Sequence, residues 1–181
     1  MQALIQRLEQ ISEQSGRATA WLTLFMVLIT FLVVVLRYLF NTGWIAMQES
    51  VSYLHAMVFM LGAAYTLKHD GHVRVDIFYS KMTTQQQARV DFFGCLLLLI
   101  PVCLFITISS WGYVLTAWSL REGSPEAGGL PFVYLLKTTM LLMTLLLLIQ
   151  GLAQLLRAFQ QWRYPPAAPL QKPSPMNRAG E

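Results

Sequence analysis

Charged side chains are scarce in this sequence, and their scarcity excludes an ordinary water-soluble domain. Lysine, arginine, aspartate and glutamate together make up 12% of the 181 residues, whereas hydrophobic residues make up 55%. A soluble globular domain typically has about a quarter of its residues charged. The deficit indicates that lipid surrounds most of the chain.

Cysteine is also rare, which limits the possible disulfides. The only two cysteines, Cys95 and Cys103, lie eight residues apart in one predicted helix, so a rise of about 12 Å separates them. A disulfide requires Cα atoms within about 7 Å of each other. We therefore expect both residues to be free thiols.

The three histidines are poorly placed for a haem or a metal ion. Bis-histidine haem ligation needs histidines that face each other from different spans, yet only His55 lies inside a predicted span, while His69 and His72 lie in a connecting segment. A zinc site in residues 69–76 would lack both a cysteine and a histidine pair at i, i+4 spacing. Because the sequence also offers no nucleophile–base pair, we expect no enzyme activity, metal or other cofactor.

Four long apolar runs take the place of the missing charges. Residues 18–36, 51–67 and 92–120 contain no charged residue, and residues 130–156 contain only Lys137. A transmembrane helix needs roughly 20 mainly apolar residues, so the runs predict an all-α integral membrane protein. Its four transmembrane helices are predicted at about residues 18–40, 48–67, 85–120 and 130–157.

The two ends of the chain differ from these runs. In the polar lead, residues 1–17, Leu4, Leu8 and Ile11 recur at helical spacing, which predicts an amphipathic helix along the cytoplasmic membrane surface. The first run is expected to stay as an anchor, because no small-residue cleavage pattern follows it. Residues 164–181 are rich in proline and are predicted to be a disordered tail.

Lysine and arginine are unevenly distributed between the runs. The two loops after the first and third spans hold one each, Arg37 and Arg121. The lead, the central segment and the tail hold ten more outside the apolar runs: Arg7, Arg17, Lys68, Arg74, Lys81, Arg89, Arg157, Arg163, Lys172 and Arg178. The positive-inside rule then places both termini in the cytoplasm. The net charge of +4 fits this topology and anionic membrane lipid, with no need of a nucleic-acid partner.

Ionisable residues inside membrane spans usually mark a transport pathway, and within the four apolar runs only His55 and Lys137 are candidates. His55 is interpreted as a hydrogen-bonded packing residue, with a partner contact or a proton relay as alternatives. Lys137 can either extend its side chain to the lipid headgroups or form a buried salt bridge with a partner subunit. Two such residues do not make a pathway for a solute.

The segment between the second and third spans carries the densest polar pattern. His72, Arg74 and Asp76 alternate with three apolar residues, which predicts an extended strip with one polar and one apolar side. Asp76 is predicted to cap a short amphipathic helix over 77–82, and Thr84 with Gln87 matches the capping-box spacing for the third span. A solvated loop that contacts lipid phosphates is the alternative for this cytoplasmic connector.

Taken in order, these features resemble the small membrane subunit (DctQ type) of tripartite ATP-independent periplasmic, or TRAP, transporters. The resemblance rests on residues 37–40 at the end of the first span, on Trp44 and Glu49, on the hexapeptide 71–76, and on Leu130-Pro131, which opens the fourth span with Pro131 in its first turn. One departure is Gln48, which occupies a position where family members often carry a second acid.

The resemblance implies a function that depends on partners in a bacterial inner membrane. A periplasmic substrate-binding protein would deliver an organic acid, a carboxylate or sialic acid, to a large membrane subunit that imports it with sodium. This chain would scaffold that subunit, and Arg74 and Asp76 would hold the connector by charge-assisted hydrogen bonds. The candidates for connector or partner contacts are His72, Arg74, Asp76, Arg37, Trp44, Glu49, Pro131 and Lys137. A stand-alone four-span membrane protein, either a small enzyme or an assembly factor, is the alternative.

Overall fold

A computed structural model of the protein describes residues 2–72 and 76–164, apart from the side chain of Asp76. Arg74 and the tail from residue 165 onward lie outside these residues, so the expectations for both stay predictions. Within the described ranges, helices are the only regular secondary structure. Four helices are long and apolar enough to cross a membrane, which confirms the predicted all-α class with four spans.

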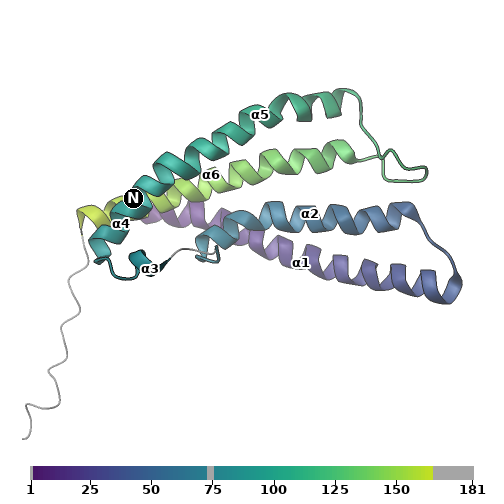
Figure 1. Cartoon of the computed structure of the whole chain (residues 1–181), viewed down its shortest axis with the longest axis horizontal. Helices are drawn as coiled ribbons and strands as arrows, with labels where there is room; N and C mark the ends of the chain where they lie inside the picture. The colour runs from purple at the N-terminus through teal and green to yellow at the C-terminus, as the bar shows by residue number, and fades with distance from the viewer. Residues whose placement is uncertain (1, 73–75, 165–181) are drawn as a thin grey trace, which may run out of the picture.

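The spanning helices form two hairpins (Figure 1). One consists of α1 and α2, and the other of α6 and the continuous helix built from α4, η1 and α5. The elements in chain order are α1 (Gln2–Phe40), α2 (Ile45–Lys68), α3 (Asp76–Tyr79), α4 (Thr84–Gly94), the π-helix η1 (Cys95–Leu99), α5 (Ile100–Ser119) and α6 (Val133–Arg163).

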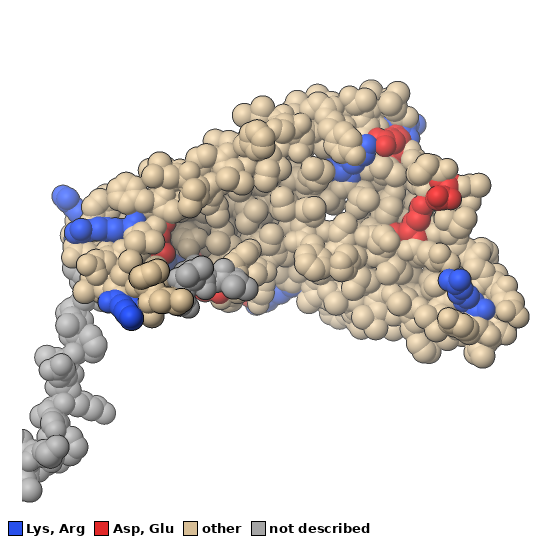
Figure 2. Space-filling view, viewed as in Figure 1, with Lys and Arg blue, Asp and Glu red and all other residues tan. Residues whose placement is uncertain are grey.

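Helix α6 joins the two hairpins. It packs against α4, η1 and α5 of its own hairpin and also against α1 and α2 of the other. The hairpins lie together at the end that holds the N-terminus and diverge toward the end that holds the turns α1–α2 and α5–α6 (Figure 1). Charged side chains gather toward these two ends, and a broad uncharged belt lies between them (Figure 2).

The lead is helical, as its periodicity predicts, but it does not form a separate surface helix. Helix α1 runs unbroken for 39 residues, or about 58 Å, so the lead continues the axis of the first span. Its polar side chains explain the difference, because Ser12 and Glu9 face α6 and bond to it.

The start of the third span differs from the prediction by one residue. The N-cap is Thr83, which has extended backbone angles, and it forms a reciprocal capping box with Gln86. The predicted capping pair, Thr84 and Gln87, is therefore one residue further along the chain than the observed pair. The connector helix α3 begins at Asp76 and ends at Tyr79, so it is shorter than the predicted helix over 77–82.

Two prolines mark local irregularities near the third and fourth spans. The π-helix η1 ends just before Pro101, which lacks an N–H and cannot continue an α-helical ladder. The wider turn lets Ile100 N donate to the carbonyl of Cys95. Pro131 is predicted in the first turn of the fourth helix but precedes it, because Phe132 is the N-cap of α6.

Small side chains line the contacts between helices, while large apolar ones face outward. Close packing of small residues is typical of helix association in lipid. At the α1–α2 contact Gly16 lies under the ring of Tyr65, where an added Cβ would come within 2.1 Å of Tyr65 Cδ2. Buried small residues include Ser12, Ala64, Ala88, Ala117, Thr144, Gly151 and Ala153. Exposed large residues include Trp21, Phe31, Phe59, Phe105 and Ile108.

The Gly16 contact gives a first prediction. Gly16→Ala should lower the thermal unfolding midpoint in detergent, because overpacking against a rigid ring typically costs about 1–3 kcal/mol. Gly112→Ala is the matched control, since nothing lies within 4 Å of a Cβ added at Gly112 and alanine favours a helix interior over glycine. An unchanged midpoint in Gly16→Ala would contradict the packing described here.

Candidate functional site

The connector is attached to the third span. The hydroxyl of Tyr79 donates to Asp91 Oδ2 at 2.8 Å, and Gln87 Nε2 donates to the carbonyl of Tyr79 at 3.0 Å. Helix α3 is thereby held on α4, with Ile77 and Phe78 exposed. These two apolar side chains are available for lipid or a partner. The sequence reasoning overlooked Tyr79 and Asp91, since their contact joins residues that no local pattern relates.

Of the predicted connector residues His72, Arg74 and Asp76, the structure describes some and not others. His72 is exposed just after the end of α2, and Asp76 begins α3. Arg74 and the Asp76 side chain lie outside the described residues. The predicted hydrogen bonds of Arg74 and Asp76 therefore stay predictions.

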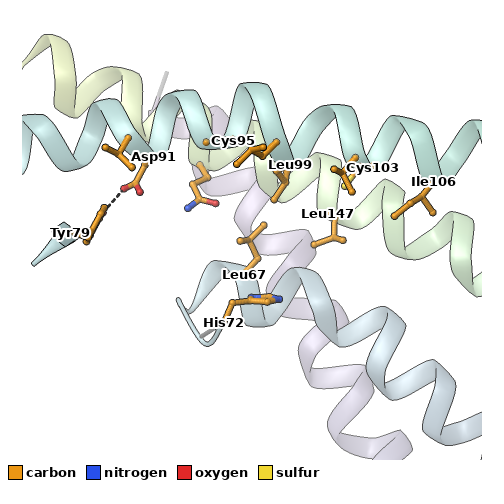
Figure 3. Close-up of a pocket in the computed structure, with 14 residues that line it drawn as sticks. Leu67, His72, Tyr79, Asp91, Cys95, Leu99, Cys103, Ile106 and Leu147 are labelled. Carbon is orange, nitrogen blue, oxygen red and sulfur yellow. Dashed lines mark hydrogen bonds between the residues drawn. The ribbon is translucent and has the colours of Figure 1, made fainter. Parts of the chain in front are cut away.

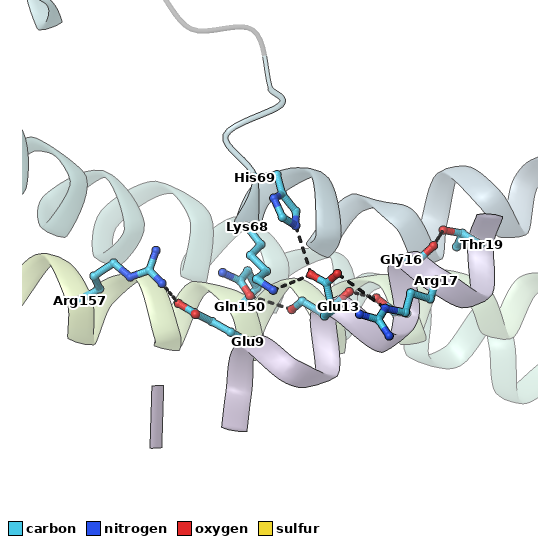
Figure 4. A network of polar contacts seen from close by, with 11 residues as sticks. Glu9, Glu13, Gly16, Arg17, Thr19, Lys68, His69, Gln150 and Arg157 are labelled. Atoms are coloured by element: carbon cyan, nitrogen blue, oxygen red, sulfur yellow. Dashed lines mark hydrogen bonds and ion pairs between the residues drawn. The ribbon is translucent and has the colours of Figure 1, made fainter. Parts of the chain in front are cut away.

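A group of polar contacts, here called the lead clasp, ties the lead to α2 and α6 (Figure 4). Glu13 Oε2 accepts from Lys68 Nζ at 2.7 Å and lies 3.2 Å from His69 Nε2. These bonds, with Lys68 as the larger cause, lower the pKa of Glu13 below its usual value. The clasp thus holds α1 against the end of α2.

The lead clasp extends to α6 through two further contacts. Ser12 Oγ donates to Gln150 Oε1 at 2.7 Å between two buried side chains, and Glu9 forms an ion pair with Arg157. The sequence interpretation counted Lys68 and Arg157 only as cytoplasmic cations. Glu9 and Glu13 lie four residues apart on one face of the lead. This pair of acids was the signal that could have indicated the partners of Lys68 and Arg157.

A second polar group, here called the loop clasp, closes the opposite end. The carboxylate of Glu49, at the start of α2, accepts from the Ser124 hydroxyl and, at 2.7 Å, from the backbone N–H of Leu130. Both donors lie in the loop between α5 and α6. Glu49 therefore connects the two hairpins where their helices diverge. Both hydrogen bonds of its carboxylate come from donors in the same chain.

Lys137 also finds its partner within the chain. Its Nζ lies 2.5 Å from Glu122 Oε2 and 3.8 Å from the centroid of the Tyr113 ring. The side chain is 13% exposed. Of the two predicted alternatives, the structure shows a salt bridge, but with an acid of the same chain and not with a partner subunit.

The remaining candidates lie on the surface and do not form one site. Arg37 and Trp44 flank the α1–α2 turn, and Pro131 lies in the α5–α6 loop; all three are exposed. His55 is exposed as well and stacks on Phe59 with ring centroids 4.7 Å apart. Its role as a hydrogen-bonded packing residue stays a prediction. Among the described residues, no group of three or more His, Cys, Asp and Glu could hold a metal ion.

Comparison with known proteins assigns the family. Residues 26–161 match the family model described as tripartite ATP-independent periplasmic transporters, DctQ component. The chain belongs to the DctQ family. This confirms the resemblance in the sequence and makes the protein a multi-pass component of a TRAP-type permease, not an enzyme.

One similar protein, from Haemophilus influenzae, is named as a TRAP transporter small permease protein. It is 35% identical over 86 residues, which cover 48% of this chain and 53% of that protein. The chain thus spans about half the length of this curated relative. No solved structure matches the chain.

The loop clasp of this DctQ protein gives a second prediction. Glu49→Ala should expose the α5–α6 loop to trypsin, because the loop loses the carboxylate that holds Ser124 and Leu130. Cleavage after Arg121, followed by mass spectrometry of the detergent-solubilised protein, should become several times faster. Gln48→Ala is the control, since Gln48 is the exposed neighbour of Glu49. Equal cleavage rates in the two variants would contradict a role of Glu49 in holding the loop.

Proposed function

We propose that this chain is the small membrane subunit of a TRAP transporter and that it scaffolds the large membrane subunit. In this proposal the large subunit imports an organic acid, a carboxylate or sialic acid, which a periplasmic substrate-binding protein delivers, and a sodium gradient drives the import. The small subunit carries no substrate itself. The family assignment and the distribution of polar groups both support the proposal.

The main support is the contrast between satisfied polar groups and uncovered apolar ones. Glu9, Glu13, Glu49 and Lys137 make their bonds within the chain, at its two ends. In the most apolar stretches of α1 and α2, by contrast, only 6% of the residues are buried inside the chain, and in α6 only 28%. Since a solute pathway needs polar lining groups, these helices suit contact with lipid and with another polypeptide.

The proposed orientation follows from the distribution of lysine and arginine. With both termini in the cytoplasm of a bacterium, the lead clasp and the connector face inward. The loop clasp then faces the periplasm, where the binding protein arrives. Arg37, Trp44 and Pro131 lie at that end and are the surface residues proposed to contact the large subunit or the docked binding protein.

Reconstitution tests the proposal directly. The tagged chain, purified in mild detergent, should bring down a larger hydrophobic subunit in fixed proportion. Vesicles that contain both subunits and the binding protein should take up the organic acid only with a sodium gradient, and omission of this chain should lower uptake. Uptake by this chain alone would overturn the scaffold role, and purification without any larger subunit would favour the stand-alone alternative.

The connector gives a further prediction. Arg74→Ala and Asp76→Ala should each weaken co-purification of the large subunit by about tenfold, since a charge-assisted hydrogen bond contributes roughly 1.5–3 kcal/mol. Uptake should fall in parallel. Lys81→Ala, which removes an exposed cation of the same connector, is the control. If both variants matched Lys81→Ala in co-purification and uptake, the connector would have no docking role.

A further inference from the structure

An apolar groove of about 650 Å³ lies between the two hairpins, near the lead clasp (Figure 3). Helices α2, α4, η1, α5 and α6 contribute to its walls. The carboxylate in its lining, Asp91, already accepts a hydrogen bond from Tyr79, and Cys95 donates to the carbonyl of Gly151. The rest of the lining is mostly apolar, so this groove suits an acyl chain and a protein helix equally.

The outer side of α2 is a different kind of surface. Between Met47 and Lys68 four residues are exposed, and all the others are partly or fully buried. The exposed residues, here called the α2 row, are Gln48, Ser52, His55 and Phe59. Steps of four, three and four residues place them on one face of the helix. The α2 row is thus the strip that α1 and α6, which pack on α2, leave uncovered.

Two polar members of the α2 row have no hydrogen bond with the described part of the chain. His55 stacks on Phe59, but no described residue donates to its ring or accepts from it. Ser52 likewise bonds to none of them. The hydroxyls of Ser50 and Thr66 on the same helix, by contrast, donate to carbonyls of the preceding turn.

The depth of the α2 row in the membrane determines what can bond to it. Glu49 and Lys68 bound a stretch of α2 without any Lys, Arg, Asp or Glu. This stretch is about 28 Å long, close to the ~30 Å thickness of the hydrocarbon core. His55 lies about 9 Å along the helix from Glu49. Water at the membrane surface can therefore bond to Gln48, the neighbour of Glu49, but it does not reach His55.

The chemistry of the imidazole selects between lipid and protein as its neighbour. A neutral imidazole carries one N–H donor and one acceptor. Acyl chains offer neither a donor nor an acceptor, and a polar group without a hydrogen bond is costly in an apolar medium. A polypeptide that brings a polar side chain to this depth satisfies His55, whereas an acyl chain leaves it unsatisfied.

A hollow beside His55 offers room for a second, apolar side chain. It has a volume of about 480 Å³ and lies between α1 and α2, with a lining of Met26, Val27, Thr30, Phe31, Val51 and His55. The Thr30 hydroxyl already donates to the carbonyl of Met26 at 2.7 Å. His55 is therefore the one unsatisfied polar group beside an otherwise apolar hollow.

We propose that the α2 row and this hollow receive a transmembrane helix of the large subunit. The helix carries a hydroxyl, amide or carboxylate side chain opposite His55, and one of its apolar side chains lies in the hollow. Hydrogen bonds between polar side chains are a common part of helix contacts in membranes. This inference rests on the proposed function, which supplies the second membrane polypeptide, and it names the face that this polypeptide covers.

Substitutions in the α2 row give opposite results for a helix contact and for a lipid contact. His55→Leu removes both hydrogen-bonding groups, whereas His55→Gln keeps a donor and an acceptor. His55→Leu and Ser52→Ala should each lower recovery of the large subunit with the tagged chain by about threefold, and the double variant by about tenfold. His55→Gln should recover it nearly as the wild type does. On a lipid-covered face the order would be reversed, since leucine suits lipid better than glutamine.

A serine of the other hairpin supplies the matched control. Ser109 is also exposed within a span, but it belongs to α5, so Ser109→Ala should recover the large subunit as the wild type does. The thermal unfolding midpoint of the isolated chain should be the same in all variants, because Ser52 and His55 make no hydrogen bond with the described residues. A loss of recovery at an unchanged midpoint assigns the effect to docking.

Photo-cross-linking identifies the occupant without these variants. Phe59 is 67% exposed beside His55, and the photo-reactive amino acid p-benzoylphenylalanine takes its place in the co-purified complex. After irradiation, a product with the summed mass of this chain and the large subunit is expected. A product of two copies of this chain, or of this chain and lipid alone, would overturn the inference.

The outcomes separate this inference from the proposed function. If the wild type recovers no large subunit, both fail. If the wild type recovers it, and Ser52→Ala and His55→Leu recover it as well as Ser109→Ala does, the large subunit covers another face. The α2 row then has no docking role, while the scaffold function stands.

Discussion

The contact of one helix, α6, with both hairpins determines the rest of this architecture. Its small residues Gly151 and Ala153 are buried, and the buried bond between Ser12 and Gln150 fixes the lead to the same stretch. Desolvated polar pairs are costly to break because each partner would be left unsatisfied. Contacts with α6 therefore fix the positions of the two hairpins relative to each other. The groove between the hairpins follows from that arrangement.

Polar groups at the two ends of the molecule bond to other groups of the same chain. The lead clasp closes the end that holds the N-terminus, and Glu49 and Glu122 close the other through the α5–α6 loop. A membrane protein whose ionisable groups are engaged in this way offers mostly apolar surface to its surroundings. Such a surface fits a protein of the DctQ family, which is described as one component of a tripartite transporter.

Composition and periodicity predicted the four spans because both depend on local sequence and on the thickness of the bilayer. They also led to the family, through short motifs in a fixed order. They did not predict the partners of Glu13, Glu49 and Lys137, since these bonds join residues far apart in the chain. Lys137 illustrates the limit: the sequence indicates a cation that needs an acid, but only tertiary structure shows that Glu122 supplies it.

The π-helix at Cys95–Leu99 has a consequence for how the third span faces its neighbour. Buried positions before and after it follow a seven-residue rhythm, Ala88 to Cys95 and then Cys103 to Ser110 to Ala117, whereas the step from Cys95 to Cys103 is eight. The extra residue is absorbed as one wide turn in the run of leucines, so neither half of the helix rotates away from α6. The contacts on both sides of this run thus keep the same phase although the run holds one residue more than a regular α-helical turn.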